Sequence, residues 1–387
     1  MAPTDTESSA FLDEPVGEAG GAPNGTDTAE LPIFTPRRML HTLIVVALLV
    51  VAIYFLFPKL VGLGDAMGQL DNADPVWVAI AVAFNVAAFG TYVALFRGVI
   101  GGDLLPLRWR EAYQITMAGL AATRFFSAGG AGGIVLSYWA LRRAGMERRV
   151  VGERMIAFLV LQYAFYPAAL IVFGVLLRTG VLPGESSVGV TIVPAAIAGV
   201  VVLIGVLVAL IPQDVERRMA GFAQGHRRAG LARRLASIPA TAADGLRTAF
   251  DLIVHPSRGG LAVAGAAGFW ATNIGILWAS FKAFGVDVPI GVVVQGFFIG
   301  MLANLFPFAP GGVGAVDAGM IGAFLLFGLP DAEVFAAVLT YRVIAFWLPI
   351  PPGVVAFFQL RRIVANWEAE GRPADTNESS VPAPARA

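Results

Sequence analysis

Long apolar runs separated by short polar stretches dominate the chain between residues 40 and 362. The runs cover residues 40–57, 75–96, 155–177, 188–211, 261–284 and 332–358. Each run, with its flanks, is long enough to cross about 30 Å of hydrocarbon as a helix. The pattern therefore predicts an all-α polytopic membrane protein with about six transmembrane helices.

Two further apolar stretches are interrupted by residues that break helices. The first covers residues 111–141 and has a glycine-rich centre, and the second covers residues 290–328 and contains Pro307 and Pro310. Lipid cannot satisfy the backbone groups that such a break exposes, so the break must be buried in protein or line a wet cavity. We predict two re-entrant helical hairpins. Eight full crossings are the alternative, as is a packing hinge that binds no ligand.

Charged residues at the ends of the runs predict the orientation of the chain. Arg37 and Arg38 precede the first run, and arginines flank both ends of the stretch 111–141. The positive-inside rule then places both termini in the cytoplasm, with the first hairpin entering from the cytoplasm and the second from outside.

The segments outside the apolar runs differ in composition. We expect disordered cytoplasmic tails at residues 1–36 and 363–387, around a membrane domain of residues 37–362. A basic cytoplasmic linker is expected at residues 212–259, because eight arginines there face four acidic residues. Part of it, such as residues 215–235, could alternatively form an amphipathic helix on anionic lipid.

The two interrupted stretches resemble each other at an offset near 180 residues. The segment 124–130 aligns with 304–310, and the helices that follow both contain tyrosine and an Ala-Phe pair. We predict an inverted repeat, with one copy at about 75–178 and the other at about 261–360. Inverted repeats with broken helices are typical of transporters, whose binding site lies near the midplane where the repeats meet.

Composition supports the membrane class and excludes several chemistries. The chain is 57% hydrophobic and only 14% charged. It contains no cysteine, its three histidines are scattered, and no Gly-Lys pair or Gly-x-Ser-x-Gly motif occurs. We therefore expect no metal, no cofactor, no nucleic-acid partner and no enzymatic activity.

Arg124 and Arg342 are the strongest candidates for a binding site. An arginine within an apolar segment costs several kcal/mol unless it faces a cavity or a partner. A lipid phosphate is a suitable partner, because guanidinium binds it through two hydrogen bonds. The alternative is a structural ion pair, for instance between Arg342 and Asp317, and the two roles are compatible at different points of a transport cycle.

The predicted substrate-binding set extends around these arginines. It comprises Arg124, Ser127, Gly129, Gly130, Gly132, Gly133, Tyr138, Asn304, Pro310, Gly311, Gly312, Gly314, Asp317, Tyr341 and Arg342. The glycines could present backbone N–H groups to a headgroup, or only permit close helix packing. The tyrosines could line a polar path, although tyrosine in membrane helices more often packs or lies at the interface.

The residues of the second hairpin resemble those of a known family. Residues 310–319, Pro-Gly-Gly-Val-Gly-Ala-Val-Asp-Ala-Gly, together with 337–342 and 346–349, resemble the closing motif of the lysylphosphatidylglycerol synthase transmembrane-region family. Residues 124–133, with the Tyr138 that follows, are similar to an earlier motif of that family. The resemblance covers about residues 40–362. It departs at Asp317, where the family pattern predicts a glutamate.

The resemblance implies a flippase-like integral membrane protein without the aminoacyl-transferase domain of the full-length synthases. We expect a plasma-membrane transporter that moves an anionic phospholipid or related amphipathic lipid between leaflets. Its further partners would be a second copy of the chain or a separate lipid-modifying enzyme. Two alternatives are a glycosyltransferase that uses Asp65, Asp71 and Asp74 on a polyprenyl-phosphate sugar, and a non-transporting partner subunit.

Overall fold

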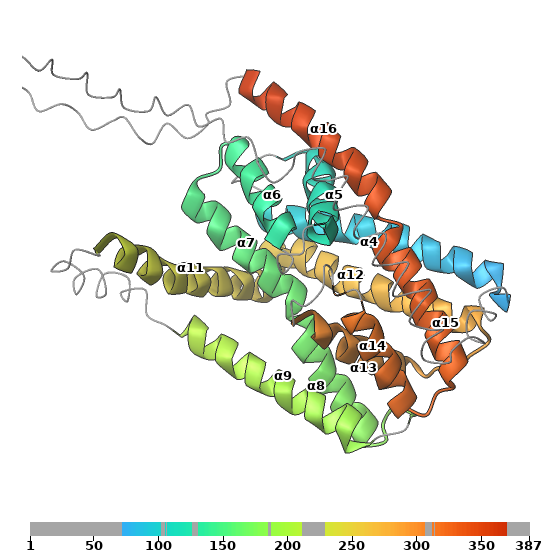
Figure 1. Ribbon diagram of the computed structural model, residues 1–387. Helices are drawn as coiled ribbons and strands as arrows, with labels where there is room; N and C mark the ends of the chain where they lie inside the picture. The colour runs from blue at the N-terminus through green and yellow to red at the C-terminus, as the bar shows by residue number, and fades with distance from the viewer. Residues whose placement is uncertain are drawn as a thin grey trace, which may run out of the picture. The chain divides into compact units, whose positions relative to one another are not determined.

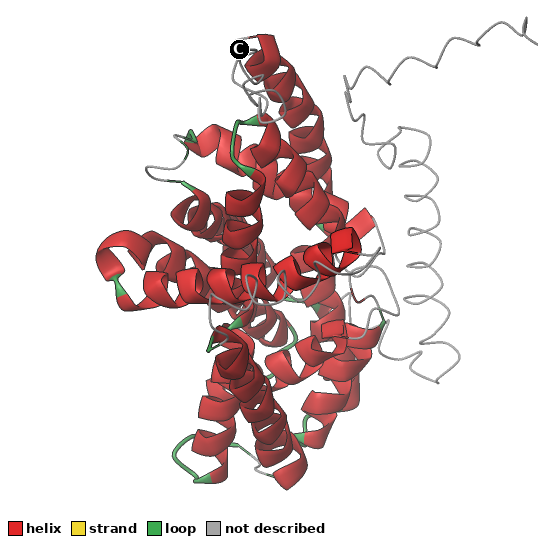
Figure 2. Ribbon diagram, turned by 90° about the vertical axis from the view of Figure 1, so that its left-hand side faces the viewer, coloured by secondary structure: helices red, strands yellow, loops and turns green. Residues whose placement is uncertain are grey.

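The computed structural model describes residues 72–369, except 102–104, 106, 126–130, 185–186, 211–228, 306–311 and 313. Every regular element within these ranges is a helix (Figures 1 and 2). The expected first span, residues 40–57, lies outside the described residues. The prediction of an all-α protein is confirmed.

Five stretches of the described ranges, each made of one or more consecutive helices, are long and apolar enough to cross a membrane. They are α4 (Pro75–Ile100), α7 (Arg148–Tyr163) with α8 (Phe165–Arg178), α9 (Val188–Ala209), α12 (Pro256–Ala283), and α15 (Asp331–Arg342) with the π-helical η6 (Val343–Trp347) and α16 (Ile350–Ala369). Large apolar side chains along α9, among them Val200, Leu203 and Leu207, are more than half exposed, as lipid contact requires. The chain is a multi-pass membrane protein.

The two interrupted stretches fold as helical hairpins. The first consists of α5 (Trp109–Phe125) and α6 (Ala131–Arg143), and the second of α13 (Ile290–Met301), the 3₁₀ segment η4 (Leu302–Leu305) and α14 (Ala315–Leu326). The α-helical arms have 12 to 17 residues. At 1.5 Å per residue they are about 18–26 Å long, shorter than the roughly 30 Å hydrocarbon core. Their length favours re-entrant arms over full crossings.

The packing of the helices repeats in the two halves of the chain. The helices α4 and α12 pack along each other, α5 packs on α16, and α13 packs on α8. In Figure 1 the hairpin α5–α6 lies above α12, and the hairpin α13–α14 lies below it. Each hairpin thus contacts the last span of the other half. The inverted repeat itself stays a prediction.

Both hairpins contain a buried glutamine, and both pack closely against a glycine of a neighbouring helix. Gln114 of α5 and Gln295 of α13 are each 1% exposed, and their numbers differ by 181. Gly353 of α16 would, with a Cβ atom, come within 2.8 Å of the Met117 carbonyl oxygen in α5. A Cβ atom at Gly174 of α8 would lie 3.4 Å from Nε2 of Gln295 in α13. Small residues at these crossings let the helix backbones approach closely.

The boundaries differ from expectation at two places. The helix α16 continues past Arg362 into the expected tail, because Val364 and Trp367 bury one helical face and Trp367 Nε1 donates to Glu111 Oε1 at 3.3 Å. The basic linker contains a helix, α11 (Ala229–Val254), which packs on α7, α9 and α12. Its residues Ala243, Ala249 and Leu252 are buried, and the alternative helix at 215–235 lies largely outside the described residues.

The second hairpin offers a direct test of its close packing. A Cβ atom at Gly300 of α13 would lie 2.8 Å from the Met320 Cα in α14, whereas one at Gly322 would meet nothing within 4 Å. We expect Gly300→Ala to destabilise the protein by about 1–3 kcal/mol through overpacking and Gly322→Ala to have little effect. Thermal unfolding in detergent measures both variants. Equal melting temperatures for the two variants would refute this packing.

Candidate functional site

A buried ion pair joins the second hairpin to the last span. Arg342, at the end of α15, places its Nε 2.5 Å from Asp317 Oδ1 in the first turn of α14. The side chains are 5% and 9% exposed, respectively. Asp317 Oδ2 also accepts a hydrogen bond from the Gly314 N–H at 2.9 Å, which fixes the start of α14. An acidic residue in the first turn of a helix also interacts favourably with the helix dipole.

The ring of Phe346 lies against both candidate arginines. Arg124 Cζ is 4.9 Å and Arg342 Cζ is 4.6 Å from the centre of this ring. Arg124 comes from the last turn of α5, in the first hairpin, whereas Phe346 belongs to η6. The structure therefore brings residues from both hairpins and from the last span together in one place. We call Arg124, Asp317, Arg342 and Phe346 the arginine cluster.

The guanidinium of Arg124 donates hydrogen bonds to two backbone carbonyl groups of the broken span. Its Nη1 donates to the Phe346 carbonyl at 2.5 Å and its Nη2 to the Ala345 carbonyl at 3.0 Å. In an α-helix the donor for the Ala345 carbonyl would be residue 349. Residue 349 is proline, which has no N–H, whereas the corresponding residue for the Phe346 carbonyl is Ile350. Arg124 therefore supplies the Ala345 carbonyl with a hydrogen bond that residue 349 cannot make.

The charges of the arginine cluster do not cancel. Within the described residues it contains two guanidinium groups and one carboxylate, and the carboxylate lies against Arg342. Arg124 binds neutral carbonyl groups and an aromatic face instead. The two guanidinium groups repel each other across the Phe346 ring. An anion that entered the cluster would therefore be attracted by both arginines, at a depth where charge is costly.

The described glycines of the predicted set shape the hairpins. Gly132 and Gly133 are buried in α6, and a Cβ atom at Gly133 would lie 2.5 Å from the Gly119 carbonyl oxygen of α5. Gly312 and Gly314 have φ angles of 68° and 84°, which side-chain-bearing residues rarely adopt. The first pair serves close packing, and the second pair turns the chain into α14 beside Asp317.

The predicted tyrosines lie apart from each other. Tyr341 is 2% exposed and packs its ring edge-on against Phe297, next to the arginine cluster. Tyr138 of α6 is 36% exposed and is not among the contacts of the cluster. Asn304 lies in η4, and its side chain is not among those described. Five further members of the predicted set, Ser127, Gly129, Gly130, Pro310 and Gly311, lie outside the described residues.

Phe346 is the member of the arginine cluster that the predicted set omits. A signal was present, because Phe346 lies in a stretch with prolines at 349, 351 and 352, and those prolines predict carbonyl groups without donors. The identity of the donor depends on a contact 222 residues away in sequence, which the local pattern does not contain.

Of the aspartates Asp65, Asp71 and Asp74, only Asp74 lies within the described residues. Asp74 begins α4, where its Oδ1 accepts a hydrogen bond from the Val76 N–H at 2.8 Å. This is the usual role of an N-cap residue. Asp65 and Asp71 lie outside the described residues, so the glycosyltransferase alternative stays a prediction.

Comparisons with known proteins agree with this architecture. A family model described as the lysylphosphatidylglycerol synthase TM region matches residues 43–353. A UPF0104 membrane protein of Methanothermobacter thermautotrophicus is 25% identical over 319 residues, which cover 77% of this chain and 89% of that protein. A shorter match, 28% identical over 81 residues, covers 21% of this chain and 10% of a phosphatidylglycerol lysyltransferase of Staphylococcus haemolyticus. The family match includes both hairpins and the whole arginine cluster.

The ion pair predicts strong coupling between its two members. We expect Asp317→Asn, which leaves the Arg342 guanidinium buried without its counter-charge, to destabilise the protein by about 3–5 kcal/mol. Arg342→Gln should have a similar effect, and the double variant should lose less than the sum of the two. Unfolding midpoints of the four proteins in the same detergent measure the coupling. Additive losses would show that the pair has no net interaction.

Proposed function

Because the chain belongs to the lysylphosphatidylglycerol synthase transmembrane-region family, we propose that it is a flippase-type transporter that moves an anionic phospholipid between leaflets. The observation that supports this most is the arginine cluster. Two guanidinium groups and one carboxylate lie within an apolar protein, at the point where the first hairpin, the second hairpin and a broken span meet. Ionisable residues in such places mark substrate pathways.

The substrate class follows from the chemistry of the cluster. A phosphodiester headgroup would neutralise the excess positive charge, and guanidinium groups bind phosphate through paired hydrogen bonds. A phospholipid crosses a bilayer slowly on its own because its charged headgroup must lose its water. The arginines offset that loss while the acyl chains stay in lipid. The Staphylococcus haemolyticus protein that matches over 81 residues is named a phosphatidylglycerol lysyltransferase. Phosphatidylglycerol is therefore our first candidate.

The contacts suggest how transport proceeds. The lipid phosphate competes with Asp317 for Arg342 and with the Ala345 and Phe346 carbonyl groups for Arg124. Either exchange loosens a hairpin from the last span, since these contacts join the hairpins to α15 and η6. The glycines Gly312 and Gly314 allow the backbone before α14 to change direction. Movement of each hairpin in turn opens the cluster to one leaflet and then to the other.

The cellular setting of the proposal rests on charge placement. The positive-inside rule favours cytoplasmic termini. The plasma membrane is the location that the family resemblance implies. The chain acts as a transporter in this proposal rather than as an enzyme. It would work as a homo-oligomer or beside a separate enzyme that modifies the lipid.

Lipid movement in proteoliposomes tests the proposal. Fluorescent phosphatidylglycerol and phosphatidylcholine are placed in one leaflet, and their transfer is followed by chemical quenching from outside. We expect the unaltered protein to move phosphatidylglycerol faster than protein-free vesicles do. Arg124→Gln should slow this transfer at least about tenfold, equivalent to about 1.4 kcal/mol in the barrier.

Two further variants sharpen the experiment. Arg124→Lys keeps the charge but loses the two-pronged geometry, so it should recover only part of the rate. Arg361→Gln, at an exposed arginine of α16, should leave the rate unchanged. Monodisperse, thermally stable protein is required for every variant. Transfer by Arg124→Gln at the unaltered rate, or no transfer of either lipid by the folded unaltered protein, would overturn the proposal.

A further inference from the structure

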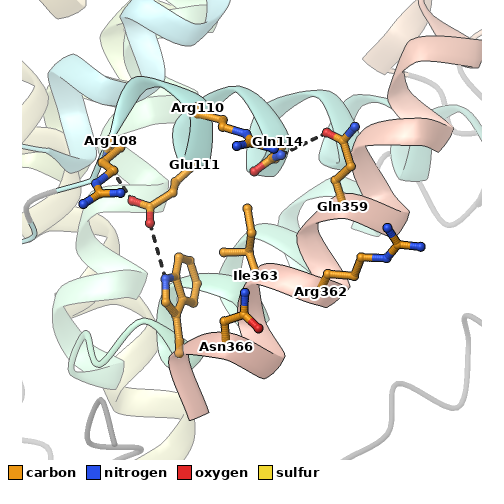
Figure 3. A pocket seen from close by; sticks show the side chains of 9 residues that line it. Arg108, Arg110, Glu111, Gln114, Gln359, Arg362, Ile363 and Asn366 are labelled. Atoms are coloured by element: carbon orange, nitrogen blue, oxygen red, sulfur yellow. Dashed lines mark hydrogen bonds between the residues drawn. The ribbon is translucent and has the colours of Figure 1, made fainter. Parts of the chain in front are cut away.

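A second polar site lies away from the arginine cluster, between the beginning of α5 and the last turns of α16. The two helices line a partly open cavity of about 440 Å³ at this place (Figure 3). The side chains around it are mostly polar, namely Arg108, Arg110, Glu111, Gln114, Gln359, Arg362, Ile363, Asn366 and Trp367. Ligand pockets commonly measure about 300–1,000 Å³. The cavity is large enough for a small phosphorylated group.

The charge around the cavity is positive. Arg108, Arg110 and Arg362 are exposed there, and no carboxylate of the described residues forms an ion pair with any of them. Glu111 is the one acidic residue in the lining, and both of its oxygens are occupied. Its Oε2 accepts from the Arg108 backbone N–H at 2.8 Å and its Oε1 from Trp367 Nε1 at 3.3 Å. Three guanidinium groups and one carboxylate thus line the cavity, which leaves an excess of positive charge.

Gln114 adds a buried group that lacks a partner. Its side chain is 1% exposed, and its Nε2 donates to Gln359 Oε1 at 2.9 Å (Figure 3). Its Oε1 is buried and makes no hydrogen bond with any described residue. A buried acceptor without a donor costs about 1–3 kcal/mol. A ligand that carried a hydroxyl group next to its negative charge would satisfy both the amide and the arginines.

The position of the cavity favours a ligand at the membrane surface. The arginines lie where the apolar runs of α5 and α16 end, and Trp367 forms one wall. Tryptophan and arginine are both enriched where a membrane helix meets the headgroup region. Both helices also lead to the arginine cluster, since α5 carries Arg124 and α16 follows η6.

We propose that this cavity is a binding site for a phosphate ester that carries a hydroxyl group, separate from the transport pathway. The arginines bind the phosphate and Gln114 accepts from the hydroxyl. The ligand is either the headgroup of an anionic phospholipid or a soluble phosphate ester. Bound there, it ties α5 to α16 and so stabilises the contact between the first hairpin and the last span. The site does not depend on the proposed transport activity, because binding is measured without lipid movement.

Ligand-dependent thermal stability tests the site. The full chain in non-ionic detergent is heated with dihexanoyl phosphatidylglycerol, dihexanoyl phosphatidylcholine, glycerol 3-phosphate or inorganic phosphate, at constant ionic strength. A ligand that binds only the folded state stabilises it by RT ln(1 + c/Kd), where c is the free ligand concentration, and so raises the melting temperature as c exceeds Kd. We expect phosphatidylglycerol to raise it and phosphatidylcholine to leave it unchanged. The double variant Arg110→Gln, Arg362→Gln should bind at least about tenfold more weakly, whereas Arg361→Gln should bind normally.

The remaining probes identify the source of the phosphate. A shift with phosphatidylglycerol but not with glycerol 3-phosphate assigns a lipid headgroup, and an equal shift with both assigns a soluble phosphate ester. Either result supports the site. No shift with any probe, or the same shift in the double variant as in the unaltered protein, would overturn it.

Discussion

The cost of placing positive charge inside an apolar protein is the constraint on which this structure depends. The Asp317 carboxylate offsets this cost for Arg342. Two carbonyl oxygens and the face of the Phe346 ring offset it for Arg124. These contacts come from three separate parts of the chain. Removing any one of them leaves a charge or a carbonyl group without compensation in lipid-like surroundings. The hairpins are therefore attached to the last span by one buried ion pair and by hydrogen bonds from a buried guanidinium.

The backbone break at η6 is coupled to this constraint. Pro349 deprives the Ala345 carbonyl of its α-helical donor, and Arg124 donates to this carbonyl and to the neighbouring Phe346 carbonyl. A continuous helix would offer Arg124 no such partners. Conversely, a break without Arg124 would expose unsatisfied carbonyl groups at membrane depth. The arginine and the prolines are mutually dependent, although they stand more than 200 residues apart.

Much of this arrangement could be predicted from the sequence, because membranes impose simple rules. Lengths of apolar runs predict the spans, and the glycines and prolines at the hairpin tips predict the breaks. Arg124 and Arg342 were predictable because they interrupt apolar surroundings. Their common contact, Phe346, was not, because the prolines at 349, 351 and 352 predict carbonyl groups without donors but do not identify Arg124, 222 residues away, as the donor. The cavity beside Gln114 was missed for a similar reason: Arg108 and Arg362 look like ordinary flanking charges until α5 and α16 are seen to pack together.

The central claim is that the hairpin tips open the arginine cluster alternately to the two sides of the membrane. The natural absence of cysteine permits a direct measurement of this. Single cysteines replace Thr123 beside Arg124, or Ala303 at the end of the second hairpin's first arm, and a membrane-impermeant maleimide is added from either side of sealed vesicles. The account predicts that both positions react from both sides, and that phosphatidylglycerol in the vesicles changes the rates. Labelling from one side only, or from neither, in folded protein would contradict it.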